Sequence, residues 1–249
     1  MIDKIYIVSI DWSEEHINSV LSVIEEVGIP PGIQWEVVGV NGHRLTNQDL
    51  IDRGITVYKD WNLSTGVVKL SDDENRFWHR DVTPGEIGCT LSHTDIWEDA
   101  YKNGYENILV YEDDIVFNSK MDWSLLDRVK KENYDLFYLG RLLQGGFDGV
   151  MDTPIDDDIC IPGFSYQTHG YLLSKSGIKK LVEQHLPKYK SMFFVVDEFL
   201  ASLYSWTPRE ELNDIFEKNL KTFALNEDVV VQYRTENYGN SLTQPKRNG

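Results

Sequence analysis

Three consecutive carboxylates, Glu112, Asp113 and Asp114, interrupt an apolar and β-branched run at residues 108–117. Apolar residues on both sides of the acids predict a buried strand. Because unpaired buried carboxylates are costly, we expect the acids where this strand ends and the chain turns into a cleft. Strand alternation would point Glu112 and Asp114 to one side and Asp113 to the other. Two oxygen ligands on one side suit a hard divalent cation such as Mn²⁺ or Mg²⁺, and a solvated acidic turn is the alternative.

The composition is that of a folded domain with an acidic surface. The chain has 249 residues, of which 41% are hydrophobic, enough to build a sizeable core. The formal net charge of −17 argues against nucleic acids and anionic membrane surfaces as partners, and it is compatible with a cationic acceptor. Cys89 and Cys160 have no spacing typical of a disulfide framework or a metal site, so two free core thiols are predicted.

No apolar run reaches the length of about 18 residues that a membrane-spanning helix requires. The N-terminal residues are typical of a strand and not of a signal peptide. These features predict a cytoplasmic protein without a transmembrane segment, or one of the endoplasmic reticulum if the chain is part of a larger protein. We expect a single domain over residues 1–249 with a polar tail from about residue 241.

Predicted strands alternate with predicted helices along the chain. The first strand–helix–strand unit predicts a parallel pair, and the whole pattern predicts a single α/β domain with a mostly parallel sheet flanked by helices. Residues 45–84 are expected to form a long excursion with short helices, and residues 144–162 a surface loop. The predicted strands are residues 4–10, 34–40, 108–117, 135–139, 164–173 and 228–233, and the predicted helices are residues 16–27, 88–103, 123–131, 174–184 and 197–204.

Ligands of open α/β sheets gather at the carboxyl ends of strands. Ser9 lies at the end of the first predicted strand and Asp11 follows it, and Asn41 and Gly42 follow the second strand. We therefore expect these four residues to contact the ligand.

Several short motifs together resemble glycosyltransferase family 25, and more closely its branch of collagen hydroxylysine galactosyltransferases than its bacterial lipooligosaccharide branch. They occur in the family's order and span roughly residues 5–240, so their combination is specific although each is short. The motifs are Gly85-Glu-Ile-Gly-Cys-Thr-Leu-Ser-His93 with Trp97, Leu109-Val-Tyr-Glu-Asp-Asp114, Phe137-Tyr-Leu-Gly-Arg141, Phe164-Ser-Tyr-Gln-Thr-His-Gly-Tyr-Leu-Leu-Ser174, Val196-Asp-Glu-Phe-Leu200 and Asn219-Leu-Lys-Thr-Phe-Ala224.

The resemblance implies a Rossmann-like GT-A fold, a UDP-sugar donor, a Mn²⁺-type metal and inversion at the anomeric carbon. It implies that Glu112 and Asp114 bind the metal. For Asp113 two roles stay open, a further ligand or donor contact and a pairing with a backbone amide. The resemblance also implies that Asp197 is the general base, with Glu198 as the alternative; a helix N-cap is the structural interpretation of Asp197.

The resemblance extends to the donor-binding residues. It implies donor contacts for Ser92 and His93, with a core histidine as the alternative for His93. Arg141 follows a strand end and is expected to contact the diphosphate, with a surface ion pair as the alternative. The position of the four residues after the first two strands predicts uridine and ribose contacts. The chain departs from the family pattern near this site. Ser9 and His16 stand where Asn and Arg are usual, and Asn41 precedes Gly42 where Asp is usual.

The leading hypothesis is a metal-dependent, inverting transferase that moves galactose from UDP-galactose to a hydroxyl group, with hydroxylysine of a collagen-like polypeptide as the first acceptor. One alternative is a UDP-sugar-dependent transferase that acts on a lipopolysaccharide or other glycan. A second alternative is a non-catalytic module that binds glycans or collagen. The oligomeric state stays open.

Overall fold

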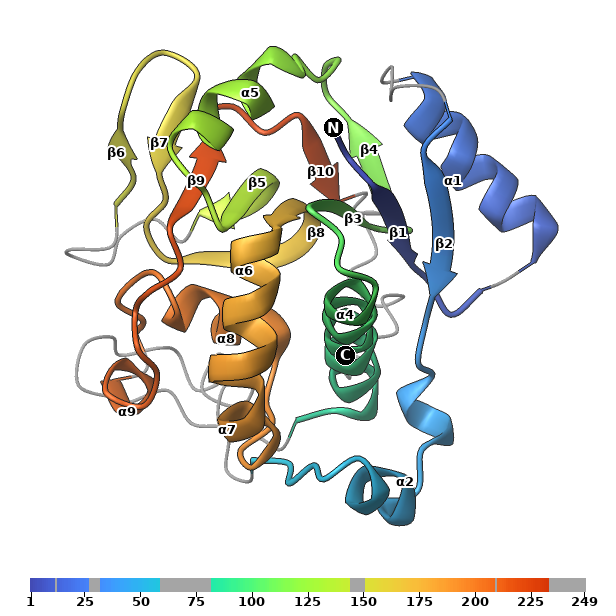
Figure 1. Ribbon diagram of the computed structural model, residues 1–249. Helices are drawn as coiled ribbons and strands as arrows, with labels where there is room; N and C mark the ends of the chain where they lie inside the picture. Colours follow the sequence, from blue (N-terminus) through green and yellow to red (C-terminus); the bar gives the residue numbers. More distant parts are fainter. Residues whose placement is uncertain (12, 27–31, 59–81, 144–150, 209, 233–249) are drawn as a thin grey trace, which may run out of the picture.

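The structure is a computed structural model that describes residues 1–11, 13–26, 32–58, 82–143, 151–208 and 210–232 (Figure 1). An eight-stranded sheet forms its centre, with the strand order β2-β1-β3-β8-β5-β9-β7-β6. Within the sheet, β8 and β7 run opposite to the other strands. The sheet is therefore mostly parallel in direction, as predicted, but β8 inserts between β3 and β5 as an antiparallel strand. In chain order the strands are β1 Lys4–Val8, β2 Gln34–Val38, β3 Asn107–Glu112, β5 Leu136–Leu143, β6 Thr153–Pro154, β7 Ile159–Ile161, β8 Ser165–Ser174 and β9 Thr222–Leu225.

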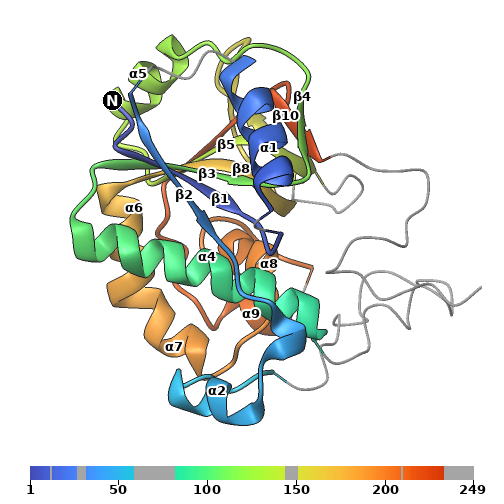
Figure 2. The ribbon, with the colours of Figure 1, turned by 90° about the vertical axis from the view of Figure 1, so that its right-hand side faces the viewer.

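Helices cover both faces of the sheet, which confirms the predicted α/β architecture (Figure 2). The helices α1 (Glu14–Glu26) and α5 (Ser124–Lys131) pack on one face. The opposite face carries α4, α6, α7 and α8. These helices are α4 Pro84–Asn103, α6 Lys175–Lys179, α7 Leu186–Lys190 and α8 Val196–Ser202. The π-helical turn η2, Lys180–His185, joins α6 to α7. Three short helices complete the described chain: η1 Gly42–Arg44, α2 Asn47–Asp52 and α9 Glu210–Asn213.

The helix α4 runs under the sheet and carries two of the predicted donor contacts. It begins at Pro84, four residues before the predicted start, because Thr83 and Glu86 form a capping box. Gly104 ends it with a φ of 69°, the left-handed conformation that glycine adopts readily. Both ends of this helix are thus determined by local sequence.

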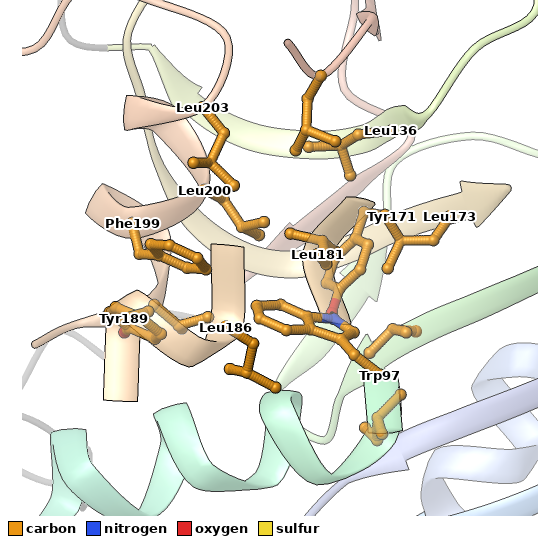
Figure 3. Close-up of a cluster of buried hydrophobic side chains, with 14 of the residues drawn as sticks. Trp97, Leu136, Tyr171, Leu173, Leu181, Leu186, Tyr189, Phe199, Leu200 and Leu203 are labelled. Carbon is orange, nitrogen blue, oxygen red and sulfur yellow. The ribbon is translucent and has the colours of Figure 1, made fainter. Parts of the chain in front are cut away.

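Aromatic packing holds α4 and α8 against the sheet (Figure 3). Trp97 of α4 is fully buried, and its Nε1 donates to the hydroxyl of Tyr171 on β8 at 3.0 Å. On the far side of the cluster, Tyr189 stacks on Phe199 of α8 with 3.6 Å between the ring centroids. The core thereby orients the two helices that bear His93 and Asp197.

The apolar run at residues 108–117 is not one strand. It divides into β3, a turn at Asp113 and Asp114, and β4 (Ile115–Phe117), which pairs with β10 (Val230–Gln232) in a separate two-stranded sheet. The acids thus lie at a strand end, as expected.

Three further predictions need revision or lie outside the described residues. The surface loop predicted at residues 144–162 was wrong in part, because β6 and β7 form a hairpin there. The strand β9 was not predicted. Residues 59–81 of the expected excursion, residues 144–150 and the polar tail lie outside the described residues. Among the helices of the described part, none combines the length and apolar character needed to cross a membrane.

Candidate active site

The acidic residues lie where three parallel strands end at one edge of the sheet. β1 pairs in parallel with both β2 and β3, and Val8, the last residue of β1, lies opposite Glu112. The backbone N–H of Asp113 donates to the carbonyl of Val8 at 3.1 Å, which ties the turn to the end of β1. This is the edge at which open α/β sheets bind ligands.

The carboxylate of Glu112 is held by two side chains from other elements. Thr168 Oγ1 of β8 donates to Glu112 Oε1 at 2.7 Å, and His93 Nε2 of α4 lies 3.3 Å from the same oxygen. Burial opposes ionisation of this carboxyl, but the hydrogen bonds from His93 and Thr168 outweigh burial and lower its pKa. Glu112 therefore stays ionised, and its second oxygen, Oε2, makes neither of these bonds.

The neighbouring Asp113 faces the other side of the sheet. Its Oδ2 lies 3.0 Å from Nε2 of His16 on α1, whereas the partner of Glu112 is on α4. The opposite orientation of these two side chains agrees with the predicted alternation. His16, which stands where the family usually has Arg, is thus the hydrogen-bonding partner of Asp113.

Asp114 is the most electrostatically strained of the three acids. Burial and the nearby charge of Glu112 raise its pKa to about 7, and the hydrogen bond from Gln232 only partly offsets them. Gln232 Nε2 donates to Asp114 Oδ2 at 2.7 Å. Asp114 Oδ1 is buried and has no hydrogen-bond partner among the residues that the structure describes. A carboxylate oxygen in this state is suited to a cation.

A buried oxygen without a partner beside a second ionised carboxylate fits a divalent metal. Hard cations prefer such oxygen ligands, and a cation would relieve the repulsion that raises the pKa of Asp114. The residues present therefore fit the predicted Mn²⁺ or Mg²⁺, with Glu112 and Asp114 as the protein ligands.

A second possible ligand set, Cys89, His93 and Glu112, competes with the hydrogen bonds of His93. One ligand atom from each of the three lies within 4.8 Å of the others. His93 Nδ1, however, lies 2.8 Å from the Tyr171 hydroxyl, which already accepts from the Trp97 indole. With the ring proton on Nε2, His93 accepts from this hydroxyl and donates to Glu112, so that the hydroxyl proton and both ring nitrogens are hydrogen-bonded. In this arrangement His93 supports Glu112 as a hydrogen-bond donor and does not offer Nε2 to a metal.

Asp197 lies in the first turn of α8, half-buried. Its Oδ2 accepts from the backbone N–H of Gln167 at 3.1 Å, and its Oδ1 accepts from the N–H of Glu198 at 2.8 Å. Burial raises its pKa, and the charges of Glu86 and Glu112 raise it further. The N-cap position belongs to Val195, so Asp197 is not the N-cap.

Adjacent residues of β8 connect the carboxyls: Gln167 donates to Asp197, Thr168 donates to Glu112, and Asp114 lies two residues after Glu112, so the structure brings these three carboxyls into one site. Glu198, the alternative base, is only 1% exposed. Asp197 is therefore the more accessible of the two acids. The assignment of the base stays a prediction.

The residues after β1 mainly organise the local chain. Ser9 is buried, and its Oγ accepts from the N–H of Asp11 at 3.1 Å. Asp11 is exposed, and its Oδ1 accepts from the N–H of Ser13 at 3.0 Å ahead of α1. The backbone N–H of Ser13 lowers the pKa of Asp11. Asp11 is therefore ionised and accessible at the same edge of the sheet.

The residues after β2 dock against α4. Asn41 caps η1 by accepting from the N–H of His43 at 3.1 Å. A Cβ on Gly42 would lie 1.7 Å from the carbonyl oxygen of Pro84, so only glycine fits this approach. Ser92 Oγ accepts from the N–H of Val40 at 2.9 Å, which connects α4 to the end of β2. The predicted donor contacts of Asn41, Gly42 and Ser92 stay predictions, and the structure adds a packing role for Gly42 and Ser92.

The side chain of Arg141 is buried and hydrogen-bonded within the protein, which was not expected. Its guanidinium forms a partly buried ion pair with Asp152 and donates to Ser165 Oγ at 2.7 Å. The pKa of Arg141 is raised, because Asp152 outweighs the opposing effect of burial. The diphosphate contact predicted for Arg141 is untested, and the guanidinium already has a carboxylate partner.

Three residues that were not predicted contact the three candidate carboxyls: Thr168, Gln167 and Gln232. Thr168 and Gln167 lie within a motif that carries the family resemblance. That motif was a signal that this strand approaches the site. Gln232 had no such signal, because only the pairing of β10 with β4 brings it to Asp114.

Comparison with known proteins identifies the family of this chain. Residues 2–149 match the model of glycosyltransferase family 25, described as an LPS biosynthesis protein. The match covers more than half of the chain, and the chain therefore belongs to glycosyltransferase family 25.

The curated relatives carry more specific names. A glycosyltransferase 25 family member of Aedes aegypti is 28% identical over 244 residues, which cover 96% of this chain and 37% of the relative. Procollagen galactosyltransferase 1 of Danio rerio is 32% identical over 165 residues, 64% of this chain and 27% of the relative. The inactive glycosyltransferase 25 family member 3 of Homo sapiens is 29% identical over 180 residues, 67% of this chain and 29% of the relative.

The chain thus spans only 27–37% of the length of these three relatives. A solved glycosyltransferase involved in glycosylation of the major capsid of PBCV-1 has a TM-score of 0.33 and 10% identity, covering 90% of this chain and 93% of that one.

Proposed function

We propose that this protein is a metal-dependent, inverting glycosyltransferase that transfers galactose from UDP-galactose to a hydroxyl acceptor. The observation that carries the proposal is the gathering of Glu112, Asp114 and Asp197 around β8, where Thr168 bonds Glu112, the neighbouring Gln167 bonds Asp197, and Gln167 reaches Asp114 through Gln232. Family membership and the similarity to procollagen galactosyltransferase 1 support the galactose donor.

The metal ligands and the base would have separate roles in the reaction. A divalent cation held by Glu112 and Asp114 would supply positive charge to the diphosphate, which becomes more negative as it leaves. The acceptor hydroxyl oxygen forms a bond to the anomeric carbon while the bond from that carbon to the UDP oxygen breaks. Asp197 takes the hydroxyl proton.

Two properties of Asp197 support this role. A general base works best when its pKa lies nearer the operating pH than that of a free carboxylate, and the pKa of Asp197 is raised. Both carboxyl oxygens accept backbone hydrogen bonds, which hold the group in one orientation, and each oxygen retains a second lone pair for a proton.

Hydroxylysine in a collagen-like polypeptide is the acceptor we propose first. The net charge of −17 favours a partner rich in lysine and hydroxylysine. A glycan acceptor is the second candidate, supported by the family description as an LPS biosynthesis protein.

A non-catalytic binding module is the candidate from a different class. It is supported by similar relatives whose names call them inactive, including the human one. The presence of Glu112, Asp114 and Asp197 in one site supports catalysis instead.

The decisive experiment measures UDP release from UDP-galactose by the purified chain with Mn²⁺, with Mg²⁺ and with chelator. UDP-glucose and UDP-N-acetylglucosamine serve as competing donors, and gelatin-derived peptides and oligosaccharides as acceptors. We expect metal-dependent turnover that gelatin peptides stimulate, and a β-linked product from the α-linked donor. UDP binding without turnover would establish the binding module, and equal rates in chelator would refute the metal assignment.

A further inference from the structure

A β-bulge in β8 lies at the centre of the site. The register of β5 against β8 shifts between the pairs Gly140–Gly170 and Leu142–Tyr166. Residues 167–169 of β8 therefore stand opposite one residue of β5. Gln167 has a φ of 72°, a left-handed conformation that is unfavourable for a residue with a side chain. Bulges of this kind redirect side chains and are common beside active sites.

The bulge contacts two of the candidate carboxylates directly. The backbone N–H of Gln167, turned by its left-handed conformation, donates to Asp197 Oδ2 at 3.1 Å. The next residue, Thr168, donates to Glu112 Oε1 at 2.7 Å. Two adjacent residues of one strand therefore hold the candidate base and one candidate metal ligand.

The side chain of Gln167 reaches the third carboxylate through Gln232. Gln167 Nε2 donates to Gln232 Oε1 at 2.8 Å, and Gln232 Nε2 donates to Asp114 Oδ2 at 2.7 Å. In the metal-binding form Asp114 is ionised and can only accept, so Gln232 then presents its amide nitrogen to Asp114 and its oxygen to Gln167, as in this structure. The direction of both bonds is thereby determined.

The two-stranded sheet places Gln232 where this relay needs it. Gln232 of β10 pairs with Ile115 of β4, the residue that directly follows Asp114. The amide of Gln232 occupies Oδ2 of Asp114, so Oδ1, which is without a hydrogen-bond partner in the described part of the chain, is the oxygen left for a cation.

We propose that Gln167 and Gln232 are positioning residues that hold the candidate metal ligand Asp114 in a fixed relation to the candidate base Asp197. The inference rests on the proposed function, because it concerns the same site. Neither glutamine needs to touch the donor: Gln232 orients Asp114 through its side chain, while Gln167 connects Gln232 to the backbone that holds Asp197.

Substitution of each glutamine by methionine tests this relay, because methionine is similar in length and makes no comparable hydrogen bond. The variants are Gln232→Met, Gln167→Met and the double variant. Gln167→Met keeps the backbone N–H that Asp197 accepts. Gln48→Met is the matched control, because Gln48 Nε2 also donates to an aspartate, Asp52, at 2.7 Å, but at the surface of α2.

The measurement is Mn²⁺ binding in the presence of UDP, followed by electron paramagnetic resonance, beside thermal unfolding of each variant. We expect Gln232→Met to weaken Mn²⁺ binding by about 10- to 100-fold, the usual effect of removing an outer-shell partner. Gln167→Met should weaken it in the same direction, and the double variant should be no weaker than Gln232→Met, because both residues act through one chain of bonds. Gln48→Met should bind Mn²⁺ like wild type.

Wild-type Mn²⁺ affinity in folded Gln232→Met and Gln167→Met would overturn the relay while leaving the proposed function intact. Additive losses in the double variant would also overturn it, because they would show independent roles. If wild type itself bound no Mn²⁺ with UDP, the metal assignment and the relay would fall together. Should Gln232→Met fail to fold, Gln167→Met and its pH–rate profile would decide the question, because a merely structural role would leave both metal affinity and that profile unchanged.

Discussion

Replacement of Asp114 by asparagine should stabilise the metal-free protein at alkaline pH while it abolishes metal-dependent activity. Asparagine keeps the shape of the side chain and an acceptor for Gln232, and it removes the charge that burial and Glu112 disfavour. The same charge would be needed to bind the metal. Stability and activity should therefore change in opposite directions at this one position.

The size and sign of the effect follow from the pKa of Asp114. The pKa rises from 3.8 to about 7, so between these values the folded chain holds a proton that the unfolded chain releases. The stability of wild type therefore falls as the pH rises through this window. At about 1.4 kcal/mol for each tenfold change, the full effect above pH 7 is on the order of 4 kcal/mol. Local relaxation and water penetration reduce such penalties, so we expect about 1–3 kcal/mol.

Urea unfolding in chelator, repeated from about pH 4 to pH 9, would measure the difference between Asp114→Asn and wild type. The stabilisation should be largest above pH 7 and should vanish toward pH 4. Asp157→Asn, an exposed carboxylate between β6 and β7, is the control for a general effect of charge. A difference that did not depend on pH, or a less stable Asp114→Asn at pH 8, would refute the electrostatic account of this site.

Three further predictions concern the base, the support of Glu112 and the packing of the donor edge. Asp197→Asn should lower the transfer rate by about 10²–10⁴-fold and leave UDP affinity nearly unchanged. Calorimetry of UDP binding and transfer assays measure the two quantities, and a parallel loss of UDP binding would place Asp197 in the donor site instead. Thr168→Val removes the 2.7 Å bond to Glu112 and should raise the Mn²⁺ concentration for half-maximal activity by about tenfold; an unchanged metal requirement would show that His93 alone orients Glu112. Gly42→Ala places a Cβ 1.7 Å from a backbone oxygen of α4 and should cost about 1–3 kcal/mol of stability in urea unfolding; unchanged stability would contradict the close approach of this glycine to α4.

Much of the architecture depends on local signals that the sequence carries. The capping box at Thr83 and Glu86 and the terminal Gly104 determine α4 through hydrogen bonds and backbone preferences within a few residues. The apolar run before Glu112 likewise determined a buried strand with acids at its end, because burying unpaired carboxylates is unfavourable. The α/β class, the first parallel unit and the position of the acidic turn could therefore be predicted.

The tertiary structure alone decided how the carboxylates are supported. Gln232 is 118 positions from Asp114 along the chain, and Thr168 is 56 positions from Glu112. Those contacts depend on the antiparallel insertion of β8, on the register of β10 against β4 and on a bulge that turns Gln167 into a left-handed conformation. Register and bulges arise from the packing of distant strands, which no window of sequence encodes. The position of the acids could therefore be predicted from the sequence. Their pKa values and the orientation of their side chains depend on partners that only the tertiary structure places beside them.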